Sequence, residues 1–148
     1  MEKGALFVLV AAFATAAADA ADYGRYATPE AAVLAVEAPF APPGGAVRVT
    51  VYASAETFLH APAHKLEGAV GPDGVAVFDL AALAPGDYAF AAYFDADGDG
   101  KLKRGRLGRP KEPFVFSNNV RPTLSRPSFD ETAVHAGPGE VIVMTLRD

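Results

Sequence analysis

Short runs of alternating apolar and polar residues recur along this chain, and turns rich in glycine and proline separate them. The alternation is cleanest in residues 47–52, where Val47, Val49 and Val51 fall on one side. Such a period of two residues is typical of a β-strand with one buried face. Residues 88–94 are apolar at nearly every position, which predicts a central strand covered on both faces.

The rest of the pattern predicts five further short strands. They are residues 33–37, 74–80, 114–116, 132–135 and 140–146. We expect the last two to pair as a hairpin around the turn 136–139 and so to close the domain. Residues 54–68 show neither period and are predicted as a loop with a short helical turn. Residues 121–130 carry two prolines and are predicted as a loop.

This spacing of strands and turns favours one fold class. Long amphipathic helices do not alternate with the strands, which disfavours a parallel α/β sheet. We therefore predict an all-β fold, a single antiparallel β-sandwich of about seven strands with Greek-key connections. At 148 residues the chain fits one domain.

The first twenty residues resemble a secretory signal peptide. Lys3 precedes a run of apolar and small residues over positions 5–18, and Ala18-Asp19-Ala20 matches a cleavage site. The run is shorter than the roughly 20 residues that span a bilayer as a helix. An uncleaved anchor is the alternative, although the acidic flank disfavours it. The predicted divisions are a signal peptide at 1–20, a flexible leader at 21–32 and a β-sandwich domain at 33–148. We expect a periplasmic or secreted protein without a membrane span after cleavage.

Charge and cysteine content narrow the possible functions. After removal of residues 1–20, 16 Asp and Glu stand against 12 Lys and Arg, a formal charge of −4. This mildly acidic balance argues against nucleic-acid binding. The chain has no cysteine, so disulfides, thiol catalysis and cysteine-ligated zinc are excluded. We expect the exported domain to be a monomer.

The most distinctive stretch places Asp95, Asp97 and Asp99 at alternate positions, with glycines between and after them. Ca²⁺ takes six to eight oxygen ligands, and alternate carboxylates let a short loop wrap around one ion. On the EF-hand template the three aspartates fall at positions 1, 3 and 5, and Gly100 falls at the sharp-turn position 6. The spacing therefore predicts a calcium-binding loop.

The EF-hand match ends soon after Lys101, whose backbone carbonyl falls at position 7. Position 12 should be a bidentate Glu, but Arg106 stands there, and a strand rather than a helix precedes the loop. The site therefore needs a further acid, and the downstream candidates are Glu112, Asp130 and Glu131. A neighbouring basic run and few carboxylates predict a weak site, in the range of about 10⁻⁴–10⁻³ M found in extracellular modules.

Six of the eleven residues from Lys101 to Lys111 are basic, and this run has two interpretations. It either neutralises the aspartates as a solvated flank or forms a surface for an acidic or glycan partner of the cell envelope. The residues assigned to such a binding surface are Lys103, Arg104, Arg106, Arg109, Lys111, Asn118 and Asn119. Phe114, Phe116 and Phe129 with Tyr93 could line a sugar-binding face, but core packing is their more common use.

The order of short motifs resembles a known family. The motifs are Leu83-x-Pro85-Gly86-x-Tyr88, Gly98-x-Gly100-Lys101-Leu102, Leu107-Gly108-x-Pro110-Lys111-Glu112-Pro113-x-x-Phe116-Ser117-Asn118-Asn119 and Pro127-x-Phe129. Over residues 33–146 the chain resembles the bacterial family catalogued as domain of unknown function 2141. The resemblance implies an exported, prealbumin-like sandwich without an established activity. Loops of that family usually carry Asn where this chain has Asp97 and Asp99, and Asp where it has Lys103.

Three functions remain open at this point. The first is a non-enzymatic exported module whose calcium loop orders residues 101–119 as a surface for a protein or glycan partner. The second is an enzyme acting on cell-envelope carbohydrate, with Asp95, Glu112 or Asp130 as acid and base. The third is a purely structural domain, in which the acidic and basic residues of the loop neutralise one another. A ligand carrier would need a continuous apolar cavity, which the many inward alanines disfavour.

Overall fold

A computed structural model describes residues 23–102, 104–105, 111–122 and 125–148. These residues form eight strands, one more than the sequence predicts, and three short helices. The strands are β1 (Val33–Glu37), β2 (Ala46–Tyr52), β3 (His64–Ala69), β4 (Val75–Asp79), β5 (Gly86–Asp95), β6 (Phe114–Phe116), β7 (Val134–Ala136) and β8 (Val141–Thr145). The helices are η1 (Gly24–Tyr26), η3 (Ser117–Asn119) and α3 (Phe129–Thr132). The all-β prediction is confirmed. No helix among the described residues is long and apolar enough to cross a membrane.

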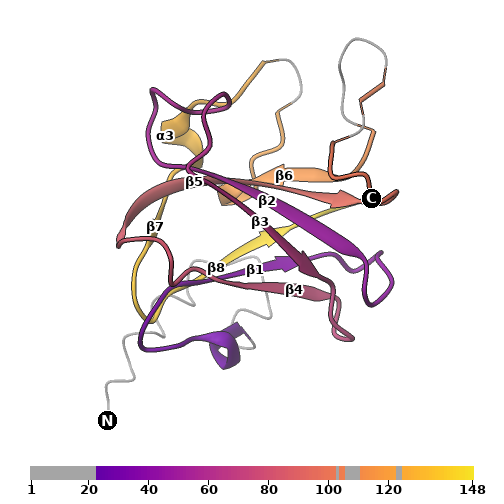
Figure 1. Ribbon diagram of the computed structural model, residues 1–148, viewed down its shortest axis with the longest axis horizontal. Coiled ribbons are helices and arrows are strands. Elements are labelled where there is room, and N and C mark those ends of the chain that lie inside the picture. The colour runs from indigo at the N-terminus through magenta and orange to yellow at the C-terminus, as the bar shows by residue number, and fades with distance from the viewer. Residues whose placement is uncertain (1–22, 103, 106–110, 123–124) are drawn as a thin grey trace.

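The strands form two sheets that lie one above the other (Figure 1). The smaller sheet has the order β4-β1-β8. The larger sheet has the order β3-β2-β5-β6, and β7 pairs with the first part of β5. The prediction that residues 88–94 form a central strand is therefore confirmed, because β5 has neighbours on both edges.

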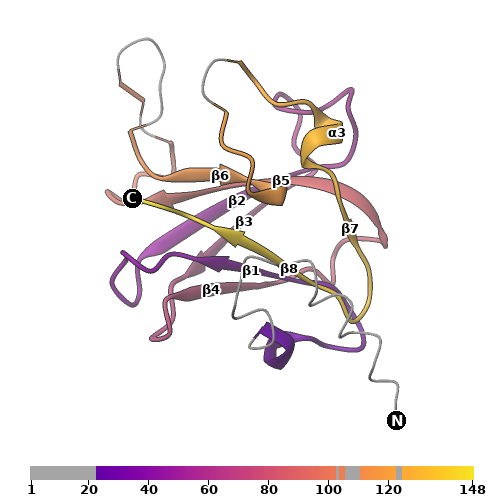
Figure 2. The same cartoon turned by 180° about the vertical axis from the view of Figure 1, so that it is seen from behind.

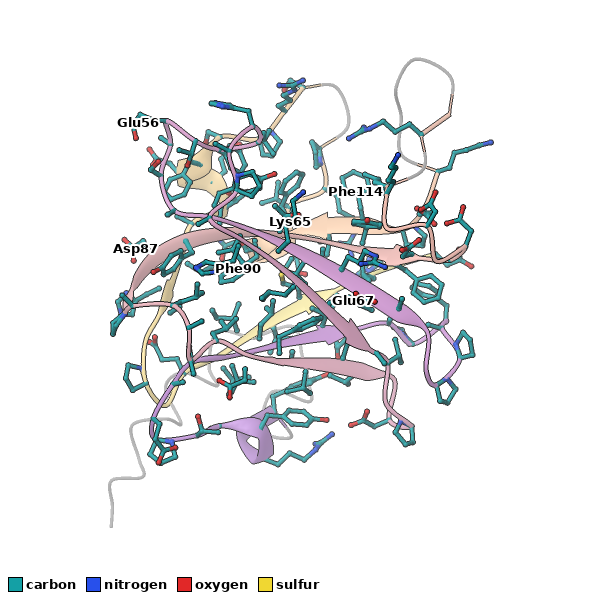
Figure 3. The ribbon with its side chains drawn as sticks, in the orientation of Figure 1. Glu56, Lys65, Glu67, Asp87, Phe90 and Phe114 are labelled. Atoms are coloured by element: carbon teal, nitrogen blue, oxygen red, sulfur yellow. The ribbon has the colours of Figure 1, made fainter. Side chains whose placement is uncertain are left out.

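Side chains of both sheets meet in one hydrophobic core. The core positions alternate along each strand, as in Val47, Val49 and Val51 of β2, which are all 1% exposed or less. Phe90 of β5 is the largest fully buried side chain and lies between the sheets (Figure 3). The alternation fixes the opposite face as well, so Arg48 and Tyr93 point away from the core.

The predicted hairpin between the last two strands is wrong. The strand at 134–136 pairs with β5, whereas β8 lies parallel to β1, with Val33 opposite Val141 and Glu37 opposite Thr145. Every other strand pair among the described residues is antiparallel. A strand can reach a parallel neighbour only through a long connection, and more than a hundred residues separate these two. Local turn chemistry could not reveal that pairing.

Two elements differ from the prediction: β3 falls mostly in the predicted loop 54–68, and α3 takes the end of the predicted loop 121–130 and the first residue of the predicted strand 132–135. The edge strand β3 has only one partly buried large apolar side chain, Leu66, so its alternation is weak. The helix α3 begins at a capping box, in which Ser128 Oγ accepts from Glu131 N and Glu131 Oε1 accepts from Ser128 N. The spacing of Ser128 and Glu131 is a known helix-start signal, which the prolines nearby obscured.

Different segments cover the two outer faces. The loop between β2 and β3, together with α3, lies over the larger sheet, and η1 lies under the smaller one (Figures 1 and 2). Tyr23 is 5% exposed and packs with Ala35 and Val75 on the outer face of the smaller sheet. Its hydroxyl donates to Glu37. The flexibility predicted for residues 21–32 stays a prediction.

Asp73 ties this leader to the turn before β4. Its carboxylate accepts hydrogen bonds from the Tyr26 hydroxyl, from Arg25 Nη2 at 3.2 Å and from Val75 N at 3.1 Å. The bond from Tyr26, followed by those from Arg25 and Val75, lowers the pKa of the Asp73 carboxyl. The ionised carboxylate is therefore the form that holds the leader.

Asp73→Asn is expected to destabilise the protein slightly near neutral pH, by less than about 1 kcal/mol, because the pair is exposed. A lowered folded-state pKa contributes stability above the unfolded-state pKa, and this is lost as pH falls through the folded-state value. Melting temperatures of the two proteins should therefore converge toward acid pH. A difference that stays constant down to acid pH would contradict this assignment.

Candidate metal centre

The aspartate loop begins where β5 ends. Phe90 and Ala92 of β5 face the core, so the alternation turns Tyr93 and Asp95 toward the outer face of the larger sheet. The side chain of Asp95 is nevertheless completely buried, with 0% of its surface exposed. The loop folds back over it, because Gly98 and Gly100 adopt positive φ of 71° and 78°, which glycine tolerates best.

One oxygen of Asp95 is saturated and the other is not. Oδ2 accepts from Arg48 Nε at 2.6 Å and from Gly100 N at 2.8 Å. Oδ1 is buried and has no hydrogen-bond partner in the part of the chain that the structure describes. A buried carboxylate oxygen without a partner is costly, since it loses water and gains nothing in return. A cation or a hydrogen-bond donor beside this oxygen would offset that cost.

The other two aspartates shape the loop and also face the same point. Asp97 Oδ1 accepts from Asp99 N at 3.2 Å, and Asp99 Oδ1 accepts from Lys101 N at 2.9 Å. Ligand oxygens of Asp95, Asp97 and Asp99 all lie within 4.8 Å of one another. Two oxygens bound to one Ca²⁺ at about 2.3–2.6 Å can be up to about 5 Å apart, so this spacing fits a single ion.

Glu112 closes the base of the loop. It is 7% exposed, and its Oε2 accepts from Ala96 N at 2.8 Å, next to Asp95. Phe94 N donates to Pro113 O at 3.0 Å one step earlier. Glu112 is not part of the group of three carboxylates within 4.8 Å. Its predicted role as a metal ligand stays a prediction, and in this structure it joins the two ends of the loop.

Arg48 is the site residue that sequence reasoning missed. It faces Tyr93 across the β2–β5 ladder, and Asp95 lies two residues further along β5. A diagonal neighbour of this kind is within reach of a long side chain. The hydrogen bond to Asp95 is the first cause that raises the pKa of Arg48. The clean alternation in β2 predicts that Arg48 points outward, but only the strand pairing tells what it meets.

The charges of Asp95 and Arg48 also act on Tyr93. Burial is the first cause that raises the pKa of its phenol. The negative charge of Asp95 also raises it, and the charge of Arg48 lowers it. The ring is therefore a neighbour of the site, although the sequence placed it only among candidate sugar-binding aromatics.

Much of the predicted basic surface lies outside the described residues, namely Lys103, Arg106 and Arg109. Arg104 and Lys111 are exposed, as a solvated flank requires. The predicted contribution of this run to partner binding stays a prediction.

The last two predicted binding residues, Asn118 and Asn119, make hydrogen bonds within the chain. Asn118 Nδ2 donates to Glu131 O at 3.1 Å and Ala133 O at 3.2 Å, which attaches α3. Asn119 Oδ1 accepts from Thr145 N at 2.9 Å, which covers part of the free edge of β8. Both residues adopt positive φ, a conformation that Asn tolerates better than most residues.

Ser117 fills a gap along the edge of β5. The partner of β5 changes from β7, which ends its pairing opposite Tyr88, to β6, which starts opposite Ala91. Phe90 N lies in the gap and donates to Ser117 Oγ at 3.0 Å, and Ser117 Oγ donates to Thr132 O at 2.5 Å. The segment 117–119 is therefore a joint between β5, α3 and β8.

Three of the four aromatics proposed as a sugar-binding face pack on the larger sheet. Phe58, in the loop after β2, lies in ring contact with Phe116 and Phe129, at centroid distances of 6.1 and 6.0 Å. Phe114 contacts Phe116 in turn. Phe58 and Phe116 are less than a tenth exposed. Packing is therefore the role that these contacts support, as the sequence favoured.

The structure also bears on two other hypotheses, the carbohydrate-acting enzyme and the ligand carrier. Asp130 lies on α3, at the opposite end of the larger sheet from the end of β5, so it cannot act with Asp95 on one bond (Figures 1 and 2).

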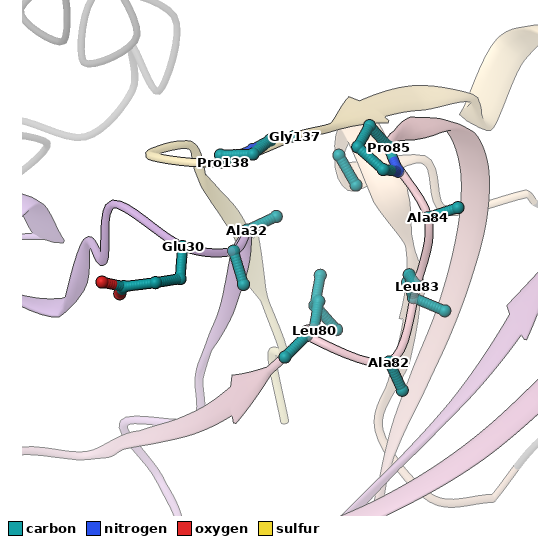
Figure 4. A pocket seen from close by; sticks show the side chains of 12 residues that line it. Glu30, Ala32, Leu80, Ala82, Leu83, Ala84, Pro85, Gly137 and Pro138 are labelled. Carbon is teal, nitrogen blue, oxygen red and sulfur yellow. The ribbon is translucent and has the colours of Figure 1, made fainter.

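A hollow of about 380 Å³ lies where the edges of the sheets diverge, between residues 80–85 and 136–138 (Figure 4). Alanine and proline line most of it, and Glu30 is its one charged lining residue.

A family model described as an uncharacterized protein conserved in bacteria, DUF2141, matches residues 40–143. The chain belongs to this family. The resemblance inferred from the motifs is thereby confirmed. The DUF2141 match runs from just before β2 into β8, so it includes both the aspartate loop and the joint at 117–119. No curated protein and no solved structure matches the chain.

Proposed function

We propose that this DUF2141 protein is an exported, non-enzymatic β-sandwich module whose Asp95–Asp99 loop binds Ca²⁺. The observation that carries the proposal is Asp95 Oδ1, which is buried beside two other carboxylates and has no hydrogen-bond partner among the described residues. Carboxylate oxygens are the ligands that hard divalent cations prefer. Export follows from the signal-like residues 1–20.

The charge of the site supports a divalent ion. Asp95, Asp97 and Asp99 bring three negative charges, and Arg48 brings one positive charge. These four groups have a formal balance of −2, and the nearby carboxylates of Glu67 and Glu112 add further negative charge that favours a cation. Gly100 N already holds Asp95 Oδ2, so the carboxylate is oriented before an ion arrives. The backbone carbonyl of Lys101, and water, would complete the coordination.

The ion would act on the segment that follows. The loop is tied at its base by Glu112 and Pro113, and the next residues enter β6 and the joint at 117–119. Binding therefore fixes the loop that carries the basic run, with Arg104 and Lys111 exposed on it. We propose that this ordered surface receives a protein or glycan partner of the cell envelope.

Calcium is expected to raise the melting temperature of the wild-type domain. About 10 mM Ca²⁺ is a hundredfold excess over a dissociation constant of about 10⁻⁴ M, which stabilises the folded state by about 2.7 kcal/mol. For a domain of this size the melting temperature should rise by about 8–13 °C over that in chelator. The rise should be clearly smaller in Asp97→Asn/Asp99→Asn, because the amide oxygens can still coordinate the ion but carry no negative charge.

The matched control is Asp130→Asn/Asp148→Asn, which removes two charges from exposed residues outside the loop. This control should keep the full response to calcium. An equal response, or no response, in the wild type and both double variants would overturn the proposed calcium site.

A further inference from the structure

Arg48 lies between two carboxylates on the outer face of the larger sheet. Its Nε donates to Asp95 Oδ2 at 2.6 Å, and its Nη1 lies 3.1 Å from Glu67 Oε1 on β3. The Asp95 side chain is fully buried, whereas 61% of the Glu67 side chain is exposed. The guanidinium of Arg48 thus contacts one buried carboxylate, that of Asp95, and one exposed carboxylate, that of Glu67.

Strand register creates this arrangement. Glu67 faces Arg48 across the β2–β3 ladder, and Tyr93 faces Arg48 across the β2–β5 ladder. Asp95 lies one outward position beyond Tyr93 on β5. The guanidinium can therefore keep its contact with Glu67 while its contact with Asp95 breaks, because the two contacts use different nitrogens.

We infer that Arg48 is a built-in competitor of the metal ion, and that ion binding shifts its guanidinium from Asp95 toward Glu67. This inference rests on the calcium-binding function proposed above. A divalent cation on Asp95 Oδ1 would lie within a few ångströms of the guanidinium bound to Oδ2 of the same carboxylate. Like charges at that distance repel, and burial weakens the screening by water.

The opposite effect, in which Arg48 assists binding by orienting Asp95, is the smaller one. Gly100 N also donates to Asp95 Oδ2, at 2.8 Å, and stays in place without the guanidinium. Asp97 and Asp99 accept from backbone donors of the loop, at Asp99 N and Lys101 N. Removal of Arg48 therefore removes a repulsive charge and leaves the loop bonds intact.

The consequence is a calcium affinity set by the sheet as well as by the loop. Arg48 lowers the affinity, and Glu67 partly restores it by holding the displaced guanidinium. Because Glu67 is on the edge strand β3, a change that moves Glu67 would alter the calcium affinity of the aspartate loop. Arg48 contacts both Glu67 on β3 and Asp95 in the aspartate loop, so this one side chain is enough to couple them.

The test measures binding of Ca²⁺ by titration calorimetry and of Tb³⁺ by its luminescence. The chain has no tryptophan, so tyrosine is the donor for Tb³⁺, and Tyr93 lies beside the site. Arg48→Gln is expected to bind Ca²⁺ about tenfold more tightly than wild type, although it melts at a lower temperature in chelator. Arg48→Lys, which keeps the charge, should stay within about threefold of wild type.

Two further variants complete the design. Glu67→Gln removes the negative charge that would hold the displaced guanidinium and should weaken Ca²⁺ binding by about threefold or more, while the bond between Arg48 and Asp95 remains. Arg126→Gln removes the same charge from an exposed position on the stretch before α3 and should stay within about twofold of wild type.

The outcomes separate this inference from the proposed function. If the wild type binds neither Ca²⁺ nor Tb³⁺, the proposed calcium site is wrong and the inference falls with it. If the wild type binds but Arg48→Gln binds equally or more weakly, the competition is wrong and the calcium site stands. Should Arg48→Gln fail to fold, Glu67→Gln decides, and an unchanged or tighter affinity overturns the inference.

Discussion

Phe90→Ala is expected to lower the free energy of unfolding by about 3–5 kcal/mol. Phe90 has no exposed surface and is the largest of the fully buried side chains. It projects from the middle of β5 into the core shared by both sheets. Truncation removes the transfer free energy of the ring and leaves a cavity that neighbouring strands can fill only in part, because ladder hydrogen bonds hold them in place.

Urea denaturation followed by circular dichroism measures this loss. Val77→Ala is the control, because Val77 is 41% exposed on the edge strand β4 and its truncation should cost well under 1 kcal/mol. Losses of equal size in the two variants would contradict the placement of Phe90 at the centre of the core.

Ser117→Ala is expected to cost about 2–4 kcal/mol, although it removes a single oxygen atom. The hydroxyl accepts from Phe90 N and donates to Thr132 O, and Ser117 is completely buried. Alanine would leave a backbone donor and a backbone acceptor without partners in a site that water does not reach. Each such orphaned group costs about 1–3 kcal/mol.

The control for Ser117→Ala is Ser125→Ala, in which the same oxygen is removed from an exposed residue, with an expected change within about 0.5 kcal/mol. Hydrogen exchange adds a second measurement. The amide of Phe90 should lose protection in Ser117→Ala more than the amides of β2, since its acceptor is gone. A variant as stable as wild type would show that the joint at 117–119 does not depend on this hydroxyl.

The two predictions concern residues that support the strand leading into the aspartate loop. Phe90 fixes the position of β5 against the other sheet, and Ser117 fixes its edge where β7 gives way to β6. Asp95 is the last residue of that strand. Substitutions at either position should therefore weaken calcium binding only through unfolding, so saturating calcium should partly restore their melting temperatures.

The motif shared with the DUF2141 family acquires a structural role in this arrangement. Ser117, Asn118 and Asn119 connect β5 to α3 and to the edge of β8 by side-chain hydrogen bonds to backbone groups. The sequence assigned the two asparagines to partner binding. Their bonds inside the chain give a physical reason for these residue types that does not need a partner.

Sequence alone determined the features that depend on neighbours along the chain. The period-2 alternation in residues 47–52 fixed both the strand and the outward side of Arg48, because successive side chains of any strand point to opposite faces. The spacing of Asp95, Asp97, Asp99 and Gly100 likewise fixed a loop with backbone turns and positive φ. These are local properties of the backbone, so a few residues suffice to specify them.

Only the tertiary structure decided which segments meet. The alternation of β2 says that Arg48 points outward, but Asp95 lies 47 positions away and becomes its partner through the register with β5. The parallel pairing of β8 with β1 and the gap that Ser117 fills have the same origin. Pairing between distant strands depends on the combined burial of many side chains, which no single stretch of sequence carries. The aspartate spacing therefore suggested an ion, and the fold added a buried oxygen without a hydrogen-bond partner among the described residues, together with the guanidinium of Arg48 on the same carboxylate.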